Sequence, residues 1–207
     1  MRRMMLDVES IGLYGDGLAY GFVIFDGDVT VEEGLAIAHP DTCAGERKDL
    51  DWINTHVFPW IDAMSPEFPK AGERSLVLND PTTGVLTTLC DGPGSLREAF
   101  WSVWEREKAR GTELWGDVCY PVEANFLASC VRARTGRKFE GPFPLLDVAT
   151  VTMVASTQDL RAPLRQCFTG VRSLPRASNE LPEHHPLMDA RHSVRRLRLG
   201  LEELGRA

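Results

Sequence analysis

The sequence predicts an α/β protein: a mixed sheet of five strands flanked by helices. Three apolar runs separated by turn signals occupy the start of the chain, and helical and strand patterns alternate in the remainder. Such an order is typical of a sheet that begins with hairpin-linked strands and is covered by helices. A chain of 207 residues without an internal repeat suits a single domain over 1–207 with a substantial core.

The first three predicted strands occupy 4–8, 18–25 and 29–38. Each carries a run of apolar or β-branched side chains, as buried strands do. The sequence Asp-Gly-Asp at 26–28 separates the second strand from the third, and a glycine between aspartates is a hairpin signal. We therefore expect three antiparallel strands at the N-terminus.

A helix is predicted over 51–64, where apolar residues recur at helical spacing. Pro59 lies inside this stretch and is expected to kink or end the helix. Residues 65–94 are rich in proline, glycine, aspartate and threonine, so we expect loops and a small insertion there.

The next helix is predicted over 95–110, with a start signal at its N-terminus and a stop signal after its C-terminus. Ser95 is the expected N-cap, and Glu98, three residues on, has the spacing of a capping box. Gly111 is expected to end the helix.

Strands and helices alternate after this point. Strands are predicted at 113–116 and 144–148, and the segment between them contains a helical pattern over 122–134. A polar, proline-bearing connection follows at 156–183. Residues 186–204 place leucines, alanine and valine three and four apart, which predicts a strongly amphipathic final helix.

Composition restricts the classes of function. Hydrophobic residues make up 43% and charged residues 26% of the chain, as in soluble proteins, and no apolar stretch is long enough to cross a bilayer. We expect a cytoplasmic protein with no signal peptide and with reduced thiols, since the five cysteines are scattered and never in CxxC spacing. The net charge of −7 argues against a broad basic surface, but metal-binding carboxylates would themselves add negative charge.

Two acids stand at the end of the first strand. Asp7 and Glu9 are two residues apart, so their side chains point to the same side of the strand. Like charges held together repel unless a cation lies between them, and Mg²⁺ or Mn²⁺ prefers such oxygen ligands. The alternative for this pair is capping of backbone donors in the exit loop.

The C-terminal sequence HHPLMDARHS adds a histidine and a third acid. His184 precedes Asp189 by five residues, and Asp189 lies near the start of the final helix. An imidazole with an ordinary pKa of ~6.5 can deprotonate water near neutral pH. Taken singly, His184 could be a loop histidine and Asp189 a first-turn acid that favours the helix dipole. Beside Asp7 and Glu9, they favour a catalytic metal site.

A fourth acid lies between these ends of the chain. Glu123 is expected in the first turn of the helix that follows the strand at 113–116, a junction where α/β folds place ligands. Asp117, just past the strand, is the competing ligand.

Three segments resemble the motifs of one enzyme family. Residues 7–13, DVESIGL, resemble the first motif, DxETTGL, of the DEDD 3′-5′ exonucleases. Residues 121–127, PVEANFL, are similar to the second motif, PFDxxFL. Residues 184–191, HHPLMDAR, resemble HxALxDAR, the third motif of the histidine-bearing DEDDh branch. The order and spacing match from residue 4 to about 200, closest to the compact exoribonuclease and phage exonuclease VIII-like members.

The resemblance implies an RNase H-like fold and hydrolysis of single-stranded RNA or DNA from the 3′ end, with RNA slightly favoured. It implies two Mg²⁺ or Mn²⁺ ions bridged by Asp7 and bound by Glu9, Asp189 and Glu123, with Asp117 as the alternative for Glu123. His184 would be the general base. The chain departs from the family at Glu123, where aspartate is usual, and at 118–119, where Val-Cys replaces His-Asn.

The resemblance also implies substrate contacts, by the backbone at Ser10, Ile11 and Gly12. Ile11 or Leu13 could wedge against a base, although core packing explains either equally well.

Arg191 and Arg195 lie one helical turn apart and could meet phosphates, or belong to a solvated helix face. Asp147 is expected to cap the helix that follows it, or to support the site.

Two other functions remain open from the sequence. One is a catalytically weak or inactive RNase H-like module that binds nucleic acid or protein. The other is a metal-dependent hydrolase of small phosphate esters. No membrane partner is expected, and the final helix or the segment 65–94 could support a homodimer.

Overall fold

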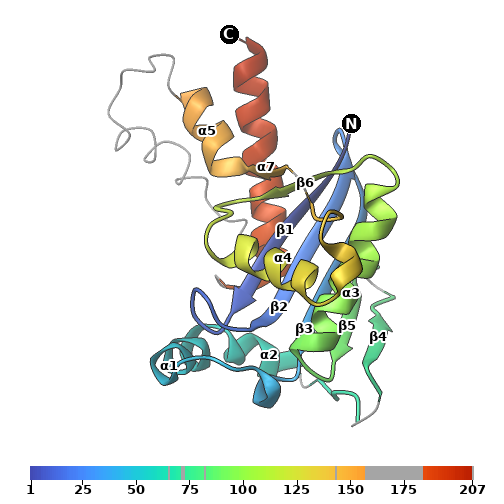
Figure 1. Cartoon of the computed structure of the whole chain (residues 1–207). Coiled ribbons are helices and arrows are strands. Elements are labelled where there is room, and N and C mark those ends of the chain that lie inside the picture. Colours follow the sequence, from blue (N-terminus) through green and yellow to red (C-terminus); the bar gives the residue numbers. More distant parts are fainter. Residues whose placement is uncertain (65, 71–72, 82, 143, 157–183, 207) are drawn as a thin grey trace.

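The computed structural model describes residues 1–207 except 65, 71–72, 82, 143, 157–183 and 207. The described residues form a mixed sheet of seven strands in the order β4-β5-β3-β2-β1-β6-β7, with helices on both faces (Figure 1). The predicted α/β class is confirmed. The predicted number of five strands was wrong, because two further strands come from the segment 65–94.

The N-terminal strands pair as the sequence predicted. The strands β1 (Arg2–Ser10), β2 (Gly17–Asp26) and β3 (Val29–Ala38) are antiparallel, and Asp26 pairs with Val29 across a tight turn. Gly27 in that turn has a φ of +56°, a conformation that glycine adopts without steric cost. Strands β6 (Glu113–Gly116) and β7 (Leu145–Asp147) run parallel to β1, so the carboxyl ends of all three meet at one edge.

The two additional strands extend the sheet beyond β3. Strand β5 (Leu86–Cys90) is parallel to β3, and β4 (Ser75–Asn79) is antiparallel to β5 at the sheet edge. Every residue of β4 is exposed. A strand without a buried face lacks the apolar–polar alternation that identifies strands in a sequence, which explains why it was missed.

Helices α3 (Pro93–Lys108) and α4 (Val122–Arg132) cover one face of the sheet. Helix α7 (Pro186–Arg206) crosses the other face, and α5 (Val148–Ser156) packs against it (Figure 1). Short 3₁₀ turns lie at Pro40–Thr42 and Thr135–Arg137.

Two helix boundaries differ from the expectation. The predicted helix over 51–64 is two helices, α1 (Arg47–His56) and α2 (Phe58–Met64), and Pro59 lies in the first turn of α2, where its missing N–H costs nothing. Helix α3 begins earlier than predicted: Gly92 is the N-cap, and the Ser95 hydroxyl accepts its N–H at 3.3 Å. Gly111 ends the helical segment with a φ of +71°, as expected.

Strand β1 divides its side chains between the two faces. Met4, Leu6 and Val8 pack into the core cluster that includes α3 and α4 residues, whereas Met5 packs on the α7 side. Because strand side chains alternate, Asp7 and Glu9 follow Met5 onto the α7 side.

A glycine brings α7 close to this face. Gly21 pairs with Asp7 across β1 and β2, and a Cβ atom at this position would lie 2.2 Å from the Leu187 nitrogen. The absence of a side chain at Gly21 therefore lets the first turn of α7 contact the sheet. Asp189, in that first turn, is carried towards β1.

No helix among the described residues has the length and apolar character needed to cross a bilayer. Within the described part of the chain, Cys43, Cys90, Cys119 and Cys130 are free thiols. Cys167 and nearly all of the predicted connection at 156–183 lie outside the described residues.

Candidate active site

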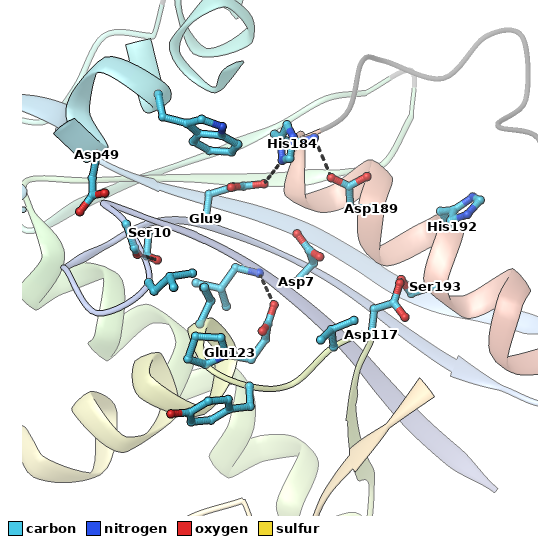
Figure 2. Close-up of a pocket in the computed structure, with 18 residues that line it drawn as sticks. Asp7, Glu9, Ser10, Asp49, Asp117, Glu123, His184, Asp189, His192 and Ser193 are labelled. Carbon is cyan, nitrogen blue, oxygen red and sulfur yellow. Dashed lines mark hydrogen bonds and ion pairs between the residues drawn. The ribbon is translucent and has the colours of Figure 1, made fainter. Parts of the chain in front are cut away.

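Three acids from the two ends of the chain meet at the edge of the sheet. Asp7 and Glu9 on β1 and Asp189 on α7 offer oxygen atoms that all lie within 4.8 Å of one another (Figure 2). The sequence predicted these three ligands, and the structure brings them together. Three converging carboxylates form the kind of oxygen donor set that Mg²⁺ and Mn²⁺ prefer.

The electrostatics of the cluster favour a cation. Burial, and then the nearby carboxylates of Glu123, Glu9 and Asp189, raise the pKa of Asp7 far above its usual range. Burial and the charges of Asp189 and Glu123 raise the pKa of Glu9 to about 9. Without a metal, these carboxyl groups either keep their protons or repel one another as carboxylates. A divalent cation between them would stabilise the ionised forms and offset the repulsion. The donor set therefore fits a hard divalent metal.

Glu123 lies beside this cluster rather than inside it. It occupies the first turn of α4, and its Oε1 accepts the N–H of Val8 at 3.4 Å. Burial raises the pKa of Glu123 to about 7, opposed by backbone N–H donors and assisted by the charges of Asp117 and Asp147. Glu123 thus joins α4 to the end of β1 and presents a carboxylate to the same cleft (Figure 2).

Asp117 lines the cleft from the end of β6 and is held by α7. Its Oδ2 accepts hydrogen bonds from the Ser193 hydroxyl at 3.2 Å and from Arg196 Nη1. Its Oδ1 is buried and has no hydrogen-bond partner among the described residues. Asp117 is therefore ion-paired through one oxygen, and the structure keeps both Glu123 and Asp117 beside the three-acid cluster.

His184 is placed at the mouth of the cluster. Its Nδ1 lies 3.8 Å from Glu9 Oε1, and its backbone N–H donates to Asp189 Oδ2 at 2.9 Å. The Trp52 ring on α1 meets the imidazole edge-to-face at a centroid distance of 4.6 Å. The side chain is 36% exposed, so the imidazole remains accessible from the cleft.

These residues line a cleft of about 720 Å³. Of the predicted substrate contacts, Ser10 and Gly12 line it and Ile11 does not, since Ile11 is 1% exposed and packs in the core. Gly12 has a φ of +69°, and a Cβ there would lie 2.2 Å from Asp49 Oδ2. Leu13, the other candidate wedge, lines the cleft and is exposed.

The structure places Arg191 away from the cleft lining. Its guanidinium pairs with Glu33 on β3, with Nε 3.0 Å from Oε2. Arg195 lies beside His192, with an Nη2–Nδ1 distance of 3.1 Å. The arrangement does not support the phosphate contact expected of Arg191, because its charge is already paired.

Asp147 caps the helix that follows it, as the sequence predicted, and also binds the loop after β6. Its Oδ1 accepts the N–H of Thr150 at 2.7 Å, which caps the first turn of α5. Its Oδ2 accepts the N–H of Cys119 at 3.1 Å and so holds the loop between β6 and α4.

Sequence reasoning missed several residues of the cleft: Asp49, Trp52, Tyr120, His192 and Ser193. Asp49 and Trp52 lie on α1, Tyr120 lies in the loop after β6, and His192 and Ser193 lie on α7. Nothing in the local sequence of these segments separates a cleft residue from a solvated one.

The fold and the cleft together define an α/β protein with a candidate metal centre built from carboxylates and a neighbouring imidazole. Comparison of the chain with models of known families and with curated proteins gave no match.

Proposed function

We propose that this protein is a metal-dependent 3′-5′ exonuclease that hydrolyses phosphodiester bonds of single-stranded nucleic acid, with RNA slightly favoured over DNA. The observation that carries the proposal is the convergence of Asp7, Glu9 and Asp189 within 4.8 Å, with His184 Nδ1 3.8 Å from Glu9. The resemblance to the DEDDh exonucleases assigns these four residues, together with Glu123, to metal binding and to the general base.

We also propose that the central part of the sheet is RNase H-like. The strands β3-β2-β1-β6-β7 comprise three antiparallel N-terminal strands followed by two strands parallel to β1. This is the five-strand arrangement expected from the resemblance. The strands β5 and β4 are then an addition at the β3 edge.

Two Mg²⁺ or Mn²⁺ ions held by Asp7, Glu9 and Asp189, with Glu123 or Asp117 completing the set, would stabilise the attacking and leaving oxygens of an in-line displacement. His184 would accept a proton from the attacking water, and the hydroxide would bond to phosphorus as the bond to the 3′ oxygen breaks. The leaving oxygen would take a proton from solvent. Glu9, beside His184 Nδ1, would stabilise the imidazolium that forms.

The test uses single-stranded RNA and DNA labelled at the 3′ or the 5′ end, incubated with Mg²⁺, Mn²⁺ or EDTA. We expect stepwise loss from the 3′ end that requires metal and is abolished in Asp7→Asn. In His184→Ala we expect a rate lower by about 10²–10⁴-fold, the usual contribution of general base catalysis. Asp28→Asn is the matched control, because Asp28 is 97% exposed in the β2–β3 turn.

Other outcomes identify the rival functions. Metal-dependent binding of oligonucleotides without cleavage would indicate a binding module. Cleavage of bis(p-nitrophenyl) phosphate but of no oligonucleotide would indicate a hydrolase of small esters. Undiminished cleavage by Asp7→Asn would contradict the assigned site.

A further inference from the structure

A rim of exposed apolar and aromatic side chains lies next to the acidic cluster. We call Leu13, Tyr14, Val118 and Tyr120 the tyrosine rim; each of these side chains is more than half exposed. Leu13 and Tyr14 come from the loop after β1, and Val118 and Tyr120 from the loop after β6. Contiguous exposed apolar surface of this kind marks binding sites more often than single exposed residues do.

The two tyrosines connect these loops. The hydroxyl groups of Tyr14 and Tyr120 lie 3.3 Å apart, although the residues are far apart in the chain. Tyr14 is 68% and Tyr120 72% exposed, so their rings remain open to solvent while their hydroxyls contact each other. Tyrosine has few rotatable bonds, and a hydroxyl contact restricts them further, so a ligand that packs on these rings loses little side-chain entropy.

The rim also separates two hollows. Tyr120 lines the metal-site cleft, and Tyr14 lines a neighbouring cavity of about 300 Å³. Ser10 and Val122 line both. A ligand that leaves the cleft on this side therefore passes over the tyrosine rim into the second cavity.

The second cavity is lined by Arg132 and by Asp16, whose Oδ1 lies 3.8 Å from Arg97 Nη1. Asn125, Ser129 and Arg132 line it along one side of α4. Arg132 is exposed, and no hydrogen bond or ion pair joins its guanidinium to the described residues. Its neighbour Arg137, in contrast, is held by Glu98. An unpaired arginine in a cavity can accept an anionic group.

We infer that the tyrosine rim and Arg132 form the subsite for the nucleotides that precede the cleaved bond: unpaired bases stack on Tyr14 and Tyr120, and a backbone phosphate meets Arg132. This inference rests on the proposed nuclease function. Aromatic rings hold any base by its π-face, so the subsite selects single strands without selecting sequence. A base stacked between its neighbours inside a duplex has no free face to offer, so a duplex is excluded.

The position of Arg132 sets a minimum length of substrate. Glu123 and Arg132 are nine residues apart on α4, which at the helical rise of ~1.5 Å per residue is about 14 Å, or about four stacked nucleotides at ~3.4 Å each. A hexanucleotide therefore reaches from the metal site to Arg132, whereas a dinucleotide does not.

Binding is measured by fluorescence of a 2-aminopurine hexanucleotide and of a dinucleotide, with Mg²⁺ and in the His184→Ala protein so that cleavage is slow during the measurement. Tyr14→Ala and Tyr120→Ala should each raise the hexanucleotide Kd by about 5–150-fold, as lost base stacking does, and reduce the quenching of 2-aminopurine. Tyr120→Phe keeps the ring and loses only the hydroxyl contact, so it should lose much less affinity than Tyr120→Ala. Phe139→Ala is the matched control, since Phe139 is exposed outside the cleft and outside the second cavity.

Arg132 gives a second and different readout. Arg132→Ala should weaken hexanucleotide binding, leave dinucleotide binding unchanged, and reduce the slope of log K against log salt by about 0.7, the value for one phosphate contact to a single strand. The tyrosine variants should leave this slope unchanged. Arg74→Ala is the control, because Arg74 is exposed beside β4 at the far edge of the sheet.

Failure of the inference and failure of the proposed function are distinguishable. If the unmodified protein degrades oligonucleotides, and the tyrosine and arginine variants bind the hexanucleotide like their controls, the subsite is wrong and the nuclease stands. If the unmodified protein neither binds nor degrades oligonucleotides with metal present, both are overturned.

Discussion

Trp60 Nε1 donates a hydrogen bond to the backbone carbonyl of His184 across 2.7 Å, which ties α2 to the segment that leads into α7. His184 has a φ of +68°, a conformation that costs a non-glycine residue about 1–3 kcal/mol and persists only where the surroundings enforce it. Its N–H is bound by Asp189, its carbonyl by Trp60, and its ring is met by Trp52. Helices α1 and α2, to which the sequence assigned no function, therefore position the proposed general base.

Replacing Trp60 by phenylalanine should separate the effect of its hydrogen bond on the position of His184 from the effect of its ring on packing. Trp60→Phe keeps an aromatic ring but leaves the His184 carbonyl without its donor, so we expect a loss of about 1–2 kcal/mol of stability. We expect kcat to fall about tenfold or more with little change in KM. This loss should be smaller than the loss caused by His184→Ala, which removes the proposed base. Steady-state kinetics on a labelled oligonucleotide, with urea denaturation alongside, measure both.

The control is Trp104→Phe. Trp104 is also buried, on the opposite face of the sheet, and its Nε1 donates to the Glu140 carbonyl at 3.5 Å. If Trp60→Phe changes kcat no more than Trp104→Phe does, the hydrogen bond has no role in positioning His184.

The acidic cluster should make the metal-free protein less stable as pH rises. The folded-state pKa values of Asp7 and Glu9 are raised, to about 9 for Glu9, so the folded state holds protons that the unfolded chain releases above pH ~4.5. The stabilising contribution of these protons is complete below pH ~4.5 and is lost as pH rises through the folded pKa. Melting temperatures in EDTA should therefore fall between pH ~5 and ~9, and Mg²⁺ should restore them at the alkaline end.

Asp7→Asn removes one of the mutually repelling carboxylates of the acidic cluster. We expect the metal-free variant to melt higher than the metal-free parent at pH 8, with a flatter pH dependence and no gain on adding Mg²⁺. Asp28→Asn should behave as the parent. A parent protein whose melting temperature in EDTA is highest at alkaline pH would contradict the repulsion between these acids.

The sequence was most informative where a local rule fixes geometry. Alternation along β1 was enough to place Asp7 and Glu9 on one side, and the repeat of apolar residues was enough to find α7. It was uninformative where a partner distant in the chain decides: Arg191 pairs with Glu33, and Ile11 is buried by the segment around Gly45. The same limitation hid β4, an exposed strand defined by its pairing with β5 and not by its own side chains.

Gly21 is the position where a single methyl group should damage the site at a distance. The Cβ of Gly21→Ala would lie 2.2 Å from the backbone nitrogen of Leu187, so the first turn of α7 must move away from the sheet. We expect a stability loss of about 1–3 kcal/mol and a weaker affinity for Mg²⁺ or Mn²⁺, because Asp189 moves with that turn. Isothermal titration calorimetry with the metal measures the second effect.

Gly94→Ala is the comparison for Gly21→Ala, because a Cβ there meets no atom within 4 Å. It should leave metal affinity unchanged. Equal metal affinity in the Gly21 and Gly94 variants would show that the close approach of α7 to β2 does not govern the site.

A buried carboxylate far from the cleft should dominate stability in acid. The Glu107 side chain is 0% exposed and accepts hydrogen bonds from Arg2 at 2.6 Å, Arg110 at 2.8 Å, Thr112 at 3.0 Å and Arg106 at 3.1 Å. Burial alone would raise the pKa of Glu107, but the bonds from Arg2, Thr112 and Arg106 outweigh it and lower the pKa to about 2.

Because its pKa is lowered on folding, ionised Glu107 stabilises the fold fully at pH values above its pKa in the unfolded chain, ~4.3. This stabilisation is lost as pH falls through the folded-state pKa of about 2. The neutral amide of Glu107→Gln cannot gain from this ionisation, and it leaves three arginines without their shared carboxylate. Because these arginines are partly exposed and screened, we expect a loss of about 2 kcal/mol at pH 7. Urea unfolding at pH 7 and pH 3 should show the difference between parent and variant shrinking in acid, because below pH ~4.3 the unfolded parent takes up a proton at Glu107 that the folded parent, with its pKa of about 2, does not. A difference that stays constant down to pH 2.5 would mean that Glu107 acts through packing and not through its charge.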